Sequence, residues 1–439
     1  MPLLQRIAVF VPGWVGFLVT AIPAGAALVP VATSAQLLAA VNSAQPGDVI
    51  TLAPGTYDLS QTLYCDTPGT ASQPITVQAL VLGTAKIRSN TVEAFRISAP
   101  YWDFENLDIQ GVCASHSDCE HAFHIGGGGD FTRIRNSRLH DFNAEIKGNG
   151  DGTPPVFPND VLIEGNELFD SVPRQTSNPV TPIDVVGGRR WVVRGNFIHD
   201  HAKAQGDQIS YAAFLKGNSR NGTFERNLVM CERDTTGFIR LGLSFGGGGT
   251  SPESICEDGT CTPEHQNGIM RNNIIVSCPA DVGIYLNKAS GTGIYNNTLY
   301  NTTGIDVRFT ASTADLRDNL LSGAIRNRDG GTSTQVSNLS GVTPAQWAAW
   351  FVSPATANFA LLNGSQIVNL GQPLAQVTDD YCGKLRSDGA PDLGAVEYGG
   401  LGICDTTKPG SGSGGGGGGA ALLRDGFESG GVGAWTAGP

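Results

Sequence analysis

A short phrase recurs along the chain between about residues 94 and 323: a few alternating apolar residues, then Asn or a related residue, then more apolar residues. Aligned on one column, the markers of its copies lie at positions 107, 137, 166, 196, 227, 273, 297 and 319. Successive markers are 30, 29, 30, 31, 46, 24 and 22 residues apart, and we interpret the interval of 46 as two turns, one of them unmarked. A repeat of this period predicts a stacked array of similar units.

The pattern within each copy predicts the type of unit. Apolar and polar residues alternate over a few positions, which indicates strands, and no segment carries a helical stripe. Strands that repeat without hairpin turns are parallel neighbours, so we predict an all-β fold: a right-handed single-stranded parallel β-helix with turns about 4.8 Å apart. Asn suits the corner because its amide bonds the turn backbone and the next Asn. We interpret this ladder as turn chemistry without a catalytic role.

The start of the chain has the pattern of a secretory signal peptide over residues 1–27. Arg6 precedes an apolar run from Ile7 to Ile22, and small residues follow at 24–27. An uncleaved anchor is disfavoured because Pro12 and Pro23 interrupt the run. No second apolar run is long enough to span a membrane. We therefore expect an exported protein, secreted or held at the cell surface.

The rest of the chain reads as one domain with a tail. We predict a β-helix domain over residues 28–400, with an N-terminal capping helix within 33–48, repeats over 49–335 and a C-terminal cap over 336–400. A Gly/Ser-rich linker follows at 401–419, and a short tail occupies 420–439. Only 15% of the residues are charged and 59 are Gly, which favours a β-rich fold over a helical one. We expect a monomer.

All nine cysteines follow the predicted leader, and export favours disulfides. The pairs that can close local loops or hold the C-terminal end are Cys113 with Cys119, Cys256 with Cys261 and Cys382 with Cys404. The remaining Cys65, Cys231 and Cys278 leave an odd thiol, and their connectivity stays open. Zinc is disfavoured because the chain has no Cys-x-x-Cys pair.

The charge of the chain limits its partners. The formal net charge is −12, and removal of the leader with Arg6 makes it about −13. Such a surface repels nucleic acid and anionic membranes, so we expect neither as a partner. An acidic substrate must be met by a local basic patch.

Alternation along the strand before each marker indicates which side chains leave the coil. In Phe123-His124-Ile125, for example, the apolar pair points inward and His124 points outward. The same rule gives one row over successive turns: His124, Glu145 with Lys147, Asp184, Phe214 with Lys216, Arg240, Tyr285 with Asn287, and Arg308. Cations, an acid and aromatic rings along a rigid groove suit an extended anionic polysaccharide.

Such a row can support β-elimination on a uronic acid, in which the C5 proton is removed while the adjacent carboxylate is neutralised. Turns about 4.8 Å apart would place Lys216 beside Arg240. Lys216 is the candidate base, because a cationic neighbour lowers the pKa of an amine. Arg240 can donate a proton to the leaving oxygen or bind the carboxylate. Glu145 and Asp184 can hold a calcium ion that neutralises the substrate. The expected substrate-binding residues are His124, Lys147, Phe214, Tyr285, Asn287 and Arg308.

The segment 213–221, followed by Asn227 and the segment 237–242, resembles the paired Lys and Arg signature of the chondroitinase B and alginate lyase family of polysaccharide lyases. The phrase at 44–57 also resembles the opening of these exported β-helix proteins. The resemblance implies that Lys216 is the base and Arg240 the acid. The family usually has Ser after the Lys and His after the Arg, whereas Gly217 and Leu241 stand here.

Two other hypotheses remain open. A glycoside hydrolase on the same coil would use two or three carboxylates, for which Asp184, Asp207 and Glu225 are available. A non-catalytic carbohydrate-binding or structural protein would need the ionisable row only to solvate its outer face. The corner Lys147-Gly148-Asn149 nearly duplicates Lys216-Gly217-Asn218, as a purely structural repeat would. The insertion 246–266 either walls the groove or is an inert loop.

Overall fold

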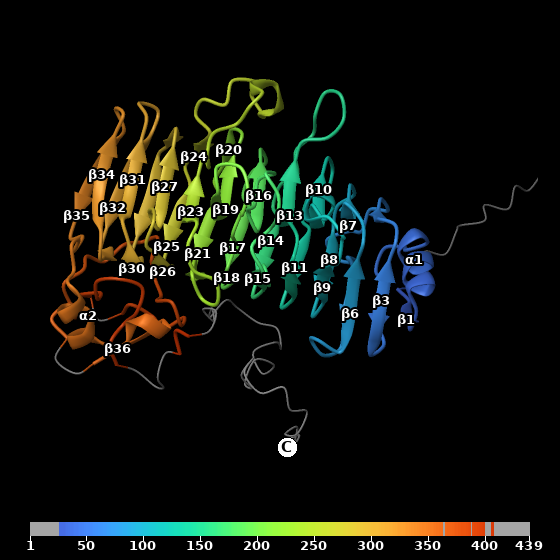
Figure 1. Ribbon diagram of the computed structural model, residues 1–439, viewed down its shortest axis with the longest axis horizontal. Coiled ribbons are helices and arrows are strands. Elements are labelled where there is room, and N and C mark those ends of the chain that lie inside the picture. The colour runs from blue at the N-terminus through green and yellow to red at the C-terminus, as the bar shows by residue number, and fades with distance from the viewer. Residues whose placement is uncertain (1–25, 363–364, 388, 400–404, 408–439) are drawn as a thin grey trace, which may run out of the picture.

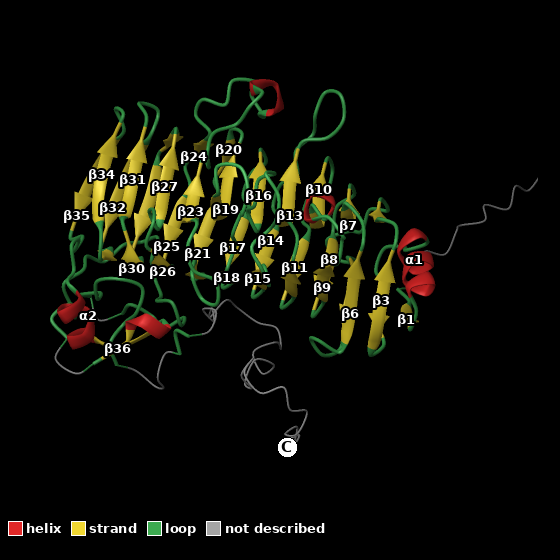
Figure 2. Cartoon of the chain, in the orientation of Figure 1, coloured by secondary structure: helices red, strands yellow, loops and turns green. Residues whose placement is uncertain are grey.

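The protein is described by a computed structural model over residues 26–362, 365–387, 389–399 and 405–407. It is an elongated coil of strands with a helix over one end and a compact cap beside the other (Figure 1, Figure 2). The predicted leader up to residue 25, and the linker and tail from residue 408, lie outside the described residues. Within the described ranges, no helix has the length and apolarity needed to cross a membrane.

Three long sheets form the sides of the coil, and every pairing within them is parallel. Sheet A contains β1 (Leu28–Val31), β2 (Val49–Leu52), β5 (Ile75–Ala79), β8 (Trp102–Glu105), β11 (Arg133–Arg135), β14 (Leu162–Glu164), β17 (Val192–Arg194), β21 (Thr223–Glu225), β25 (Ile269–Arg271), β29 (Thr292–Tyr295), β32 (Thr313–Arg317) and β35 (Thr332–Val336). Sheet B contains β3 (Gly55–Leu59), β6 (Ala85–Ser89), β9 (Asp108–Gly111), β12 (Arg138–His140), β15 (Glu167–Phe169), β18 (Phe197–His199), β22 (Leu228–Met230), β26 (Ile274–Cys278), β30 (Thr298–Thr302) and β33 (Leu320–Leu321).

Sheet C forms the third side, and it carries the predicted groove. It contains β4 (Leu63–Cys65), β7 (Glu93–Ile97), β10 (His121–Gly126), β13 (Ala144–Asn149), β16 (Ile183–Val186), β19 (Ile209–Lys216), β23 (Ile239–Phe245), β27 (Ile284–Asn287), β31 (Gly304–Arg308) and β34 (Ala324–Arg328). A small fourth sheet joins β20 (Ser219–Arg220), β24 (His265–Gln266) and β28 (Ala289–Ser290). The predicted fold class, a right-handed parallel β-helix with an N-terminal capping helix, is confirmed.

The inward side chains of the three sheets form one continuous apolar core. Alternating burial along β5 and β6 shows the expected period of two. Rings from different sheets meet inside: Phe95 and Phe123 of sheet C lie 5.2 Å apart between ring centroids, and Phe104 of sheet A lies 4.7 Å from Phe123. The contact between Phe104 and Phe123 packs sheet A against sheet C across the core.

The Asn ladder runs along the corner between sheets A and B. Asn196 Nδ2 donates to Asn227 Oδ1 at 3.0 Å, and Asn227 Nδ2 donates to Asn273 Oδ1 at 2.9 Å. Each of these amides also bonds the turn backbone, so the buried polar groups of the ladder have hydrogen-bond partners. The ladder continues past the last predicted marker, because Asn319 Nδ2 donates to Asn338 Oδ1 at 2.7 Å.

The interval of 46 residues is one turn, so the interpretation as two turns is wrong. Asn227 bonds Asn273 directly, and β21 pairs with β25 without a strand between them. The extra residues form the insertion from Gly246 to Glu264, which leaves the coil at the end of β23. An insertion in a turn lengthens the repeat without disturbing the pairing of strands.

Both ends of the repeats are covered. Helix α1 (Ser34–Asn42), capped by Thr33, packs Leu37 and Val41 onto the first turn. The C-terminal cap contains α2 (Pro344–Trp350) and the antiparallel pair β36 (Phe351–Ser353) and β37 (Asn358–Leu361). The apolar cluster between this cap and the later strands of sheet B includes Phe197, Leu228, Trp347, Trp350 and Phe359. The two tryptophans therefore pack in the apolar interior of the cap.

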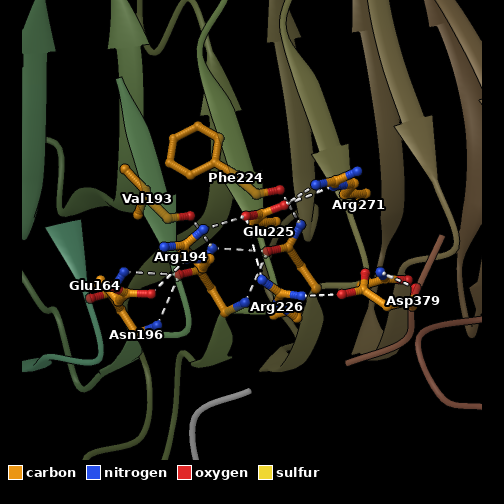
Figure 3. A network of polar contacts seen from close by, with 12 residues as sticks. Glu164, Val193, Arg194, Asn196, Phe224, Glu225, Arg226, Arg271 and Asp379 are labelled. Atoms are coloured by element: carbon orange, nitrogen blue, oxygen red, sulfur yellow. Dashed lines mark hydrogen bonds and ion pairs between the residues drawn. The ribbon is translucent and has the colours of Figure 1, made fainter. Parts of the chain in front are cut away.

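Ion pairs fasten the cap to sheet A, as Figure 3 shows. The Glu225 carboxylate accepts a hydrogen bond from Arg271 Nε at 2.7 Å and lies 3.5 Å from Arg194 Nη1. The neighbouring Arg226 pairs with Asp379 of the cap. Glu225 and Arg226 are both buried. Removing one partner from a buried network of ion pairs lowers the free energy of unfolding by more than an exposed ion pair contributes to it.

Disulfides are present in the described residues. Both predicted local bridges are found, between Cys113 and Cys119 and between Cys256 and Cys261. Two of the cysteines that the sequence left unassigned, Cys231 and Cys278, join adjacent turns of the coil. The odd thiol is the buried Cys65. Cys382 is disulfide-bonded, and its predicted partner, residue 404, lies outside the described residues.

We predict that Asn227→Ala lowers the free energy of unfolding by about 2–4 kcal/mol, because the substitution leaves buried groups of Asn196 and Val193 without partners. Urea unfolding measures the loss. The matched control is Asn338→Ala at the half-buried end of the ladder, where water can replace the amide. Equal losses in the two variants would contradict the ladder as a buried hydrogen-bond network.

Candidate functional site

The outer face of sheet C carries the predicted row of side chains. Strand pairing places His124 opposite Lys147, Lys147 opposite Asp184, and Asp184 opposite Phe214. The row continues through Ser244 to Tyr285. A second row lies two residues further along the strands and holds Lys216, Asn287 and Arg308. The parallel register therefore gathers these side chains into one band across several turns.

Lys147, Asp184 and Lys216 form the charged centre of this band. Lys147 Nζ donates to Asp184 Oδ1 at 2.8 Å, and both side chains are largely buried. Burial opposes ionisation of Asp184, but the charges of Lys147 and Lys216 outweigh it and hold the pKa of this carboxyl below its usual value. Asp184 is therefore a carboxylate held between two amines.

Lys216 has the surroundings of a candidate base. Its Nζ donates to the carbonyl of Gly249 at 3.1 Å and lies 4.6 Å from the ring centroid of Phe214. Burial lowers the pKa of this amine; Lys147 adds to the shift, whereas Asp184 and Glu264 oppose it. A larger fraction of Lys216 is then neutral near neutral pH than for an exposed lysine.

The insertion from Gly246 to Glu264 forms a wall of the groove. The fully buried Glu264 carboxylate accepts from Gly217 N at 2.8 Å and from the hydroxyl of Thr250 at 2.7 Å. Asn287 Nδ2 donates to the carbonyl of Gly247 at 3.0 Å. These bonds hold the Gly-rich segment against Lys216, so of the two hypotheses for the insertion the structure supports a wall.

The other end of the band is a histidine cluster. His124 Nδ1 lies 2.5 Å from Glu93 Oε1, and its Nε2 lies 2.6 Å from Asn149 Oδ1. His121 lies beside it, with ring centroids 5.1 Å apart, and Lys147 is a further neighbour. Burial, aided by His124 and Lys147, lowers the pKa of His121 to about 3, so this imidazole is neutral.

His121 is not among the predicted site residues, because simple alternation from His124 points it inward. The alternation breaks at the start of β10, where Ala122 and Phe123 are both buried. This pair of adjacent apolar residues is the signal that could have located the break.

The predicted placement of Arg240 beside Lys216 is wrong. Arg240 pairs with Ser210 at the start of β19, whereas Lys216 lies at its other end. Six positions separate the two along the strands, about 20 Å at roughly 3.3 Å per residue. Arg240 is 1% exposed and donates to the carbonyls of Cys231 and Thr235. It therefore holds a loop and does not face the groove.

The predicted calcium pair of Glu145 and Asp184 does not form. Glu145 is fully buried at the corner between sheets B and C, with Asp170 and Arg174 as charged neighbours. Asp184 is instead bonded to Lys147 on the groove. The two carboxylates do not converge on one point, so this residue pair does not fit a calcium ion.

Other acidic groups in the described part of the chain lie close enough to hold a cation. His199, Asp200 and Asp234 bring one ligand atom each within 4.8 Å. Asp200 already accepts three backbone N–H groups, among them those of Asp234 and Thr235, and it lies 2.8 Å from His199 Nδ1. Its lone pairs are used by the protein, which disfavours a metal there.

The carboxylates considered for a hydrolase are also separated. Asp184 lies on sheet C, Glu225 lies on sheet A, and Asp207 pairs with Lys203 in the loop before β19. Glycoside hydrolysis needs two carboxyl groups within about 10 Å across one bond. Groups on different sides of the coil cannot meet one sugar in this way.

Known proteins are similar to this chain in sequence and in fold. No family model matches the chain. Pectate lyase L from Dickeya chrysanthemi is 25% identical in an alignment over 426 residues. The alignment covers 82% of this chain and 84% of that protein. The structure of pectate lyase Pel9A aligns with TM-score 0.59 and 16% identity, over 82% of this chain and 90% of that one. A Paenibacillus alginate lyase aligns with TM-score 0.44 and 15% identity, over 70% of this chain and 99% of that one.

The alignment with Pel9A supports the parallel β-helix fold. The alignment with the Paenibacillus alginate lyase is weaker, with a TM-score of 0.44. The predicted resemblance to polysaccharide lyases with this fold is confirmed.

We predict that Glu145 makes stability fall as pH rises. Burial raises the pKa of Glu145 to about 8, above its usual value of 4.5. The folded state then binds more protons between these two values, so the free energy of unfolding falls by about 2–5 kcal/mol from pH 4.5 to pH 8. Below pH 4.5 the Glu145 carboxyl is protonated in both the folded and the unfolded state, so it no longer makes the free energy of unfolding depend on pH.

Urea unfolding across this pH range, in the protein and in Glu145→Gln, isolates the contribution of the one carboxyl. Asp234 is exposed, so Asp234→Asn is the control. Its free energy of unfolding should change with pH as that of the unmodified protein does. A Glu145→Gln variant with the same slope would contradict a raised pKa.

Proposed function

We propose that this protein is an exported polysaccharide lyase that cleaves an anionic, uronic-acid-containing polysaccharide by β-elimination in the groove over sheet C. The observation that carries the proposal is Lys216: an amine with a lowered pKa, beside a groove in which Lys147 and Asp184 are already paired. The similarity to a pectate lyase along most of the chain supports the same class of reaction. Three disulfides suit an exported protein.

The polymer would lie along the axis of the coil, so that successive turns contact successive parts of it. The side chains proposed to bind it are His124, Lys147, Phe214, Tyr285, Asn287 and Arg308. Lys147 would meet the uronate carboxylate, because it is a cation held in place by Asp184. Its charge offsets the negative charge that develops as the proton leaves.

The neutral amine of Lys216 would take the C5 proton. The electrons of the broken C5–H bond form a double bond between C4 and C5, and the C4–O bond breaks. The leaving oxygen takes a proton from the new ammonium of Lys216 or from water. The wall segment next to Gly249 limits the access of water to this amine. No step is assigned to Arg240 or to calcium.

A second candidate function is carbohydrate binding without cleavage. The displacement of Arg240 from the groove favours it, because the resemblance implied a Lys and Arg pair and only the Lys faces the groove. The repeated Lys-Gly-Asn corner at Lys147 favours it as well. Under this hypothesis the band binds the polymer and releases it unchanged.

We predict that the protein generates ultraviolet-absorbing unsaturated ends on at least one of polygalacturonate, alginate, chondroitin or dermatan, and hyaluronan. Lys216→Ala should reduce this activity by about 10²- to 10⁴-fold, the usual contribution of a positioned base. Lys384→Ala in the C-terminal cap is the matched control. Each assay is run with added calcium and with a chelator.

The other outcomes separate the hypotheses. Reducing ends without absorbance would indicate a hydrolase, and retained binding without any product would indicate the non-catalytic protein. Full activity in Lys216→Ala would exclude this amine as the base.

We also predict the effect of Asp184 on the pH profile. Its carboxylate raises the pKa of Lys216, so Asp184→Asn should lower that pKa. The base is active when neutral, and the rise of kcat/KM with pH should therefore begin at lower pH in the variant. Asp315→Asn on sheet A is the control. A rise that moves to higher pH would contradict the assignment of this limb to Lys216.

A further inference from the structure

A cavity lies on the outer face of sheet B, whereas Lys147, Asp184 and Lys216 lie on sheet C. Its volume is about 220 Å³, and residues of β6, β9, β12 and β15 line it. The cations among them are Lys86, Arg88, Arg138 and His140, and Asp108 is the carboxylate. A cavity lined by four cations stands out on a chain whose net charge is −12.

Carboxylates hold two of the cations in place, and one of these carboxylates, Asp108, itself lines the cavity. Arg138 Nε lies 2.9 Å from Glu167 Oε2. His140 Nδ1 lies 2.9 Å from Asp141 Oδ2, and its Nε2 lies 3.3 Å from Asp108 Oδ1. Burial lowers the pKa of His140, but these two carboxylates outweigh it and raise the value to about 9. The imidazole is therefore charged at neutral pH, and its position is set before any ligand arrives.

The other two cations form an exposed rim. Arg88 lies 3.2 Å from Asp58, and these side chains are 51% and 70% exposed. An ion pair this exposed contributes little and exchanges readily for a ligand. Lys86 lies opposite Asp108 in the strand register and is itself exposed. The cavity thus combines a fixed charged floor with a rim of long, solvent-exposed cations.

The remaining lining suits a sugar ring better than a simple anion. The ring of Phe169 stacks between His140 and His199, at 4.9 and 4.8 Å between centroids, so the imidazoles cover both of its faces and only its edge is left for a ligand. Gln110, on the strand next to His140, donates its amide N–H to Asp141 Oδ2 at 3.0 Å, which leaves its side-chain carbonyl oxygen as an acceptor. An inorganic anion would need only the cations, whereas the hydroxyl groups of a sugar acid can donate to the acceptor oxygens of Gln110 and Asp108.

The cavity lies on the half of sheet B that no described residue of the C-terminal cap covers. The later strands of this sheet are buried by the cap, in an apolar cluster that includes Leu228, Val276 and Trp347. The earlier strands, β6 to β15, hold the cavity.

We propose that this cavity is a second carbohydrate-binding site, which takes one acidic sugar residue and binds its carboxylate between the rim of Lys86 and Arg88 and the fixed Arg138. The site goes beyond the proposed function, because it lies on another side of the coil from Lys216. It would hold an anionic polymer without cleaving it.

Calorimetric titration of the full chain with digalacturonate tests the proposal. The titration is made in Lys216→Ala, which prevents turnover, so its outcome is independent of lyase activity. We expect two classes of site. The double variant Lys86→Ala, Arg88→Ala should bind the sugar at least tenfold more weakly at one class and leave the other unchanged. Lys384→Ala, Arg190→Ala removes two cations elsewhere and is the matched control.

Both rim residues are exposed, so the double variant should keep its midpoint of thermal unfolding. Gln110→Ala is a second variant, and it should weaken the same class of site without a change in charge. Titrations of Lys216→Ala that neither variant changes would overturn the proposal, whatever the number of classes of site, because the cavity on sheet B would then not bind the sugar. Equal displacement by inorganic phosphate at the same concentration would also overturn it, because the cavity would then bind any anion.

Discussion

Each turn of the coil is bound to the next by hydrogen bonds between parallel strands, and this bonding admits no change in the number of residues within a strand. The Asn ladder enforces the same register at the corner between sheets A and B, where each amide bonds the next and the turn backbone. Extra residues can enter only at the other corners. This is why a turn of 46 residues stacks on turns of 31 and 24 without a break.

The groove follows from that constraint. Because parallel strands repeat in register, outward side chains of successive turns fall into rows, and Lys147 meets Asp184 although 37 residues separate them. The chemistry of the row is then set by what the corners place over it. The wall from Gly246 to Glu264 lowers the exposure of Lys216 and thereby its pKa.

The corner between sheets B and C has a different character. Glu145, Asp170 and Arg174 are buried there, and no oxygen of the two carboxylates has a hydrogen-bond partner among the described protein atoms. Arg240 is buried near Asp170 as well. Burial raises the pKa of both carboxyls, and the nearby Arg174, whose Nε lies 3.7 Å from Asp170 Oδ1, only partly opposes the shift. Two residues expected in the groove thus belong to the interior of this corner.

The sequence alone determined the coil, because the repeated Asn and the two-residue alternation are local signals that one register must satisfy. It also determined the row of His124, Lys147, Asp184, Phe214 and Tyr285, because side-chain direction follows from position within a strand. Only the tertiary structure decided which outward positions stay open to solvent and where each strand begins. Loops between sheets B and C shift the start of β23, which carries Arg240 away from Lys216, and they bury Glu145. Loop packing depends on contacts between distant residues, and no local pattern records those contacts.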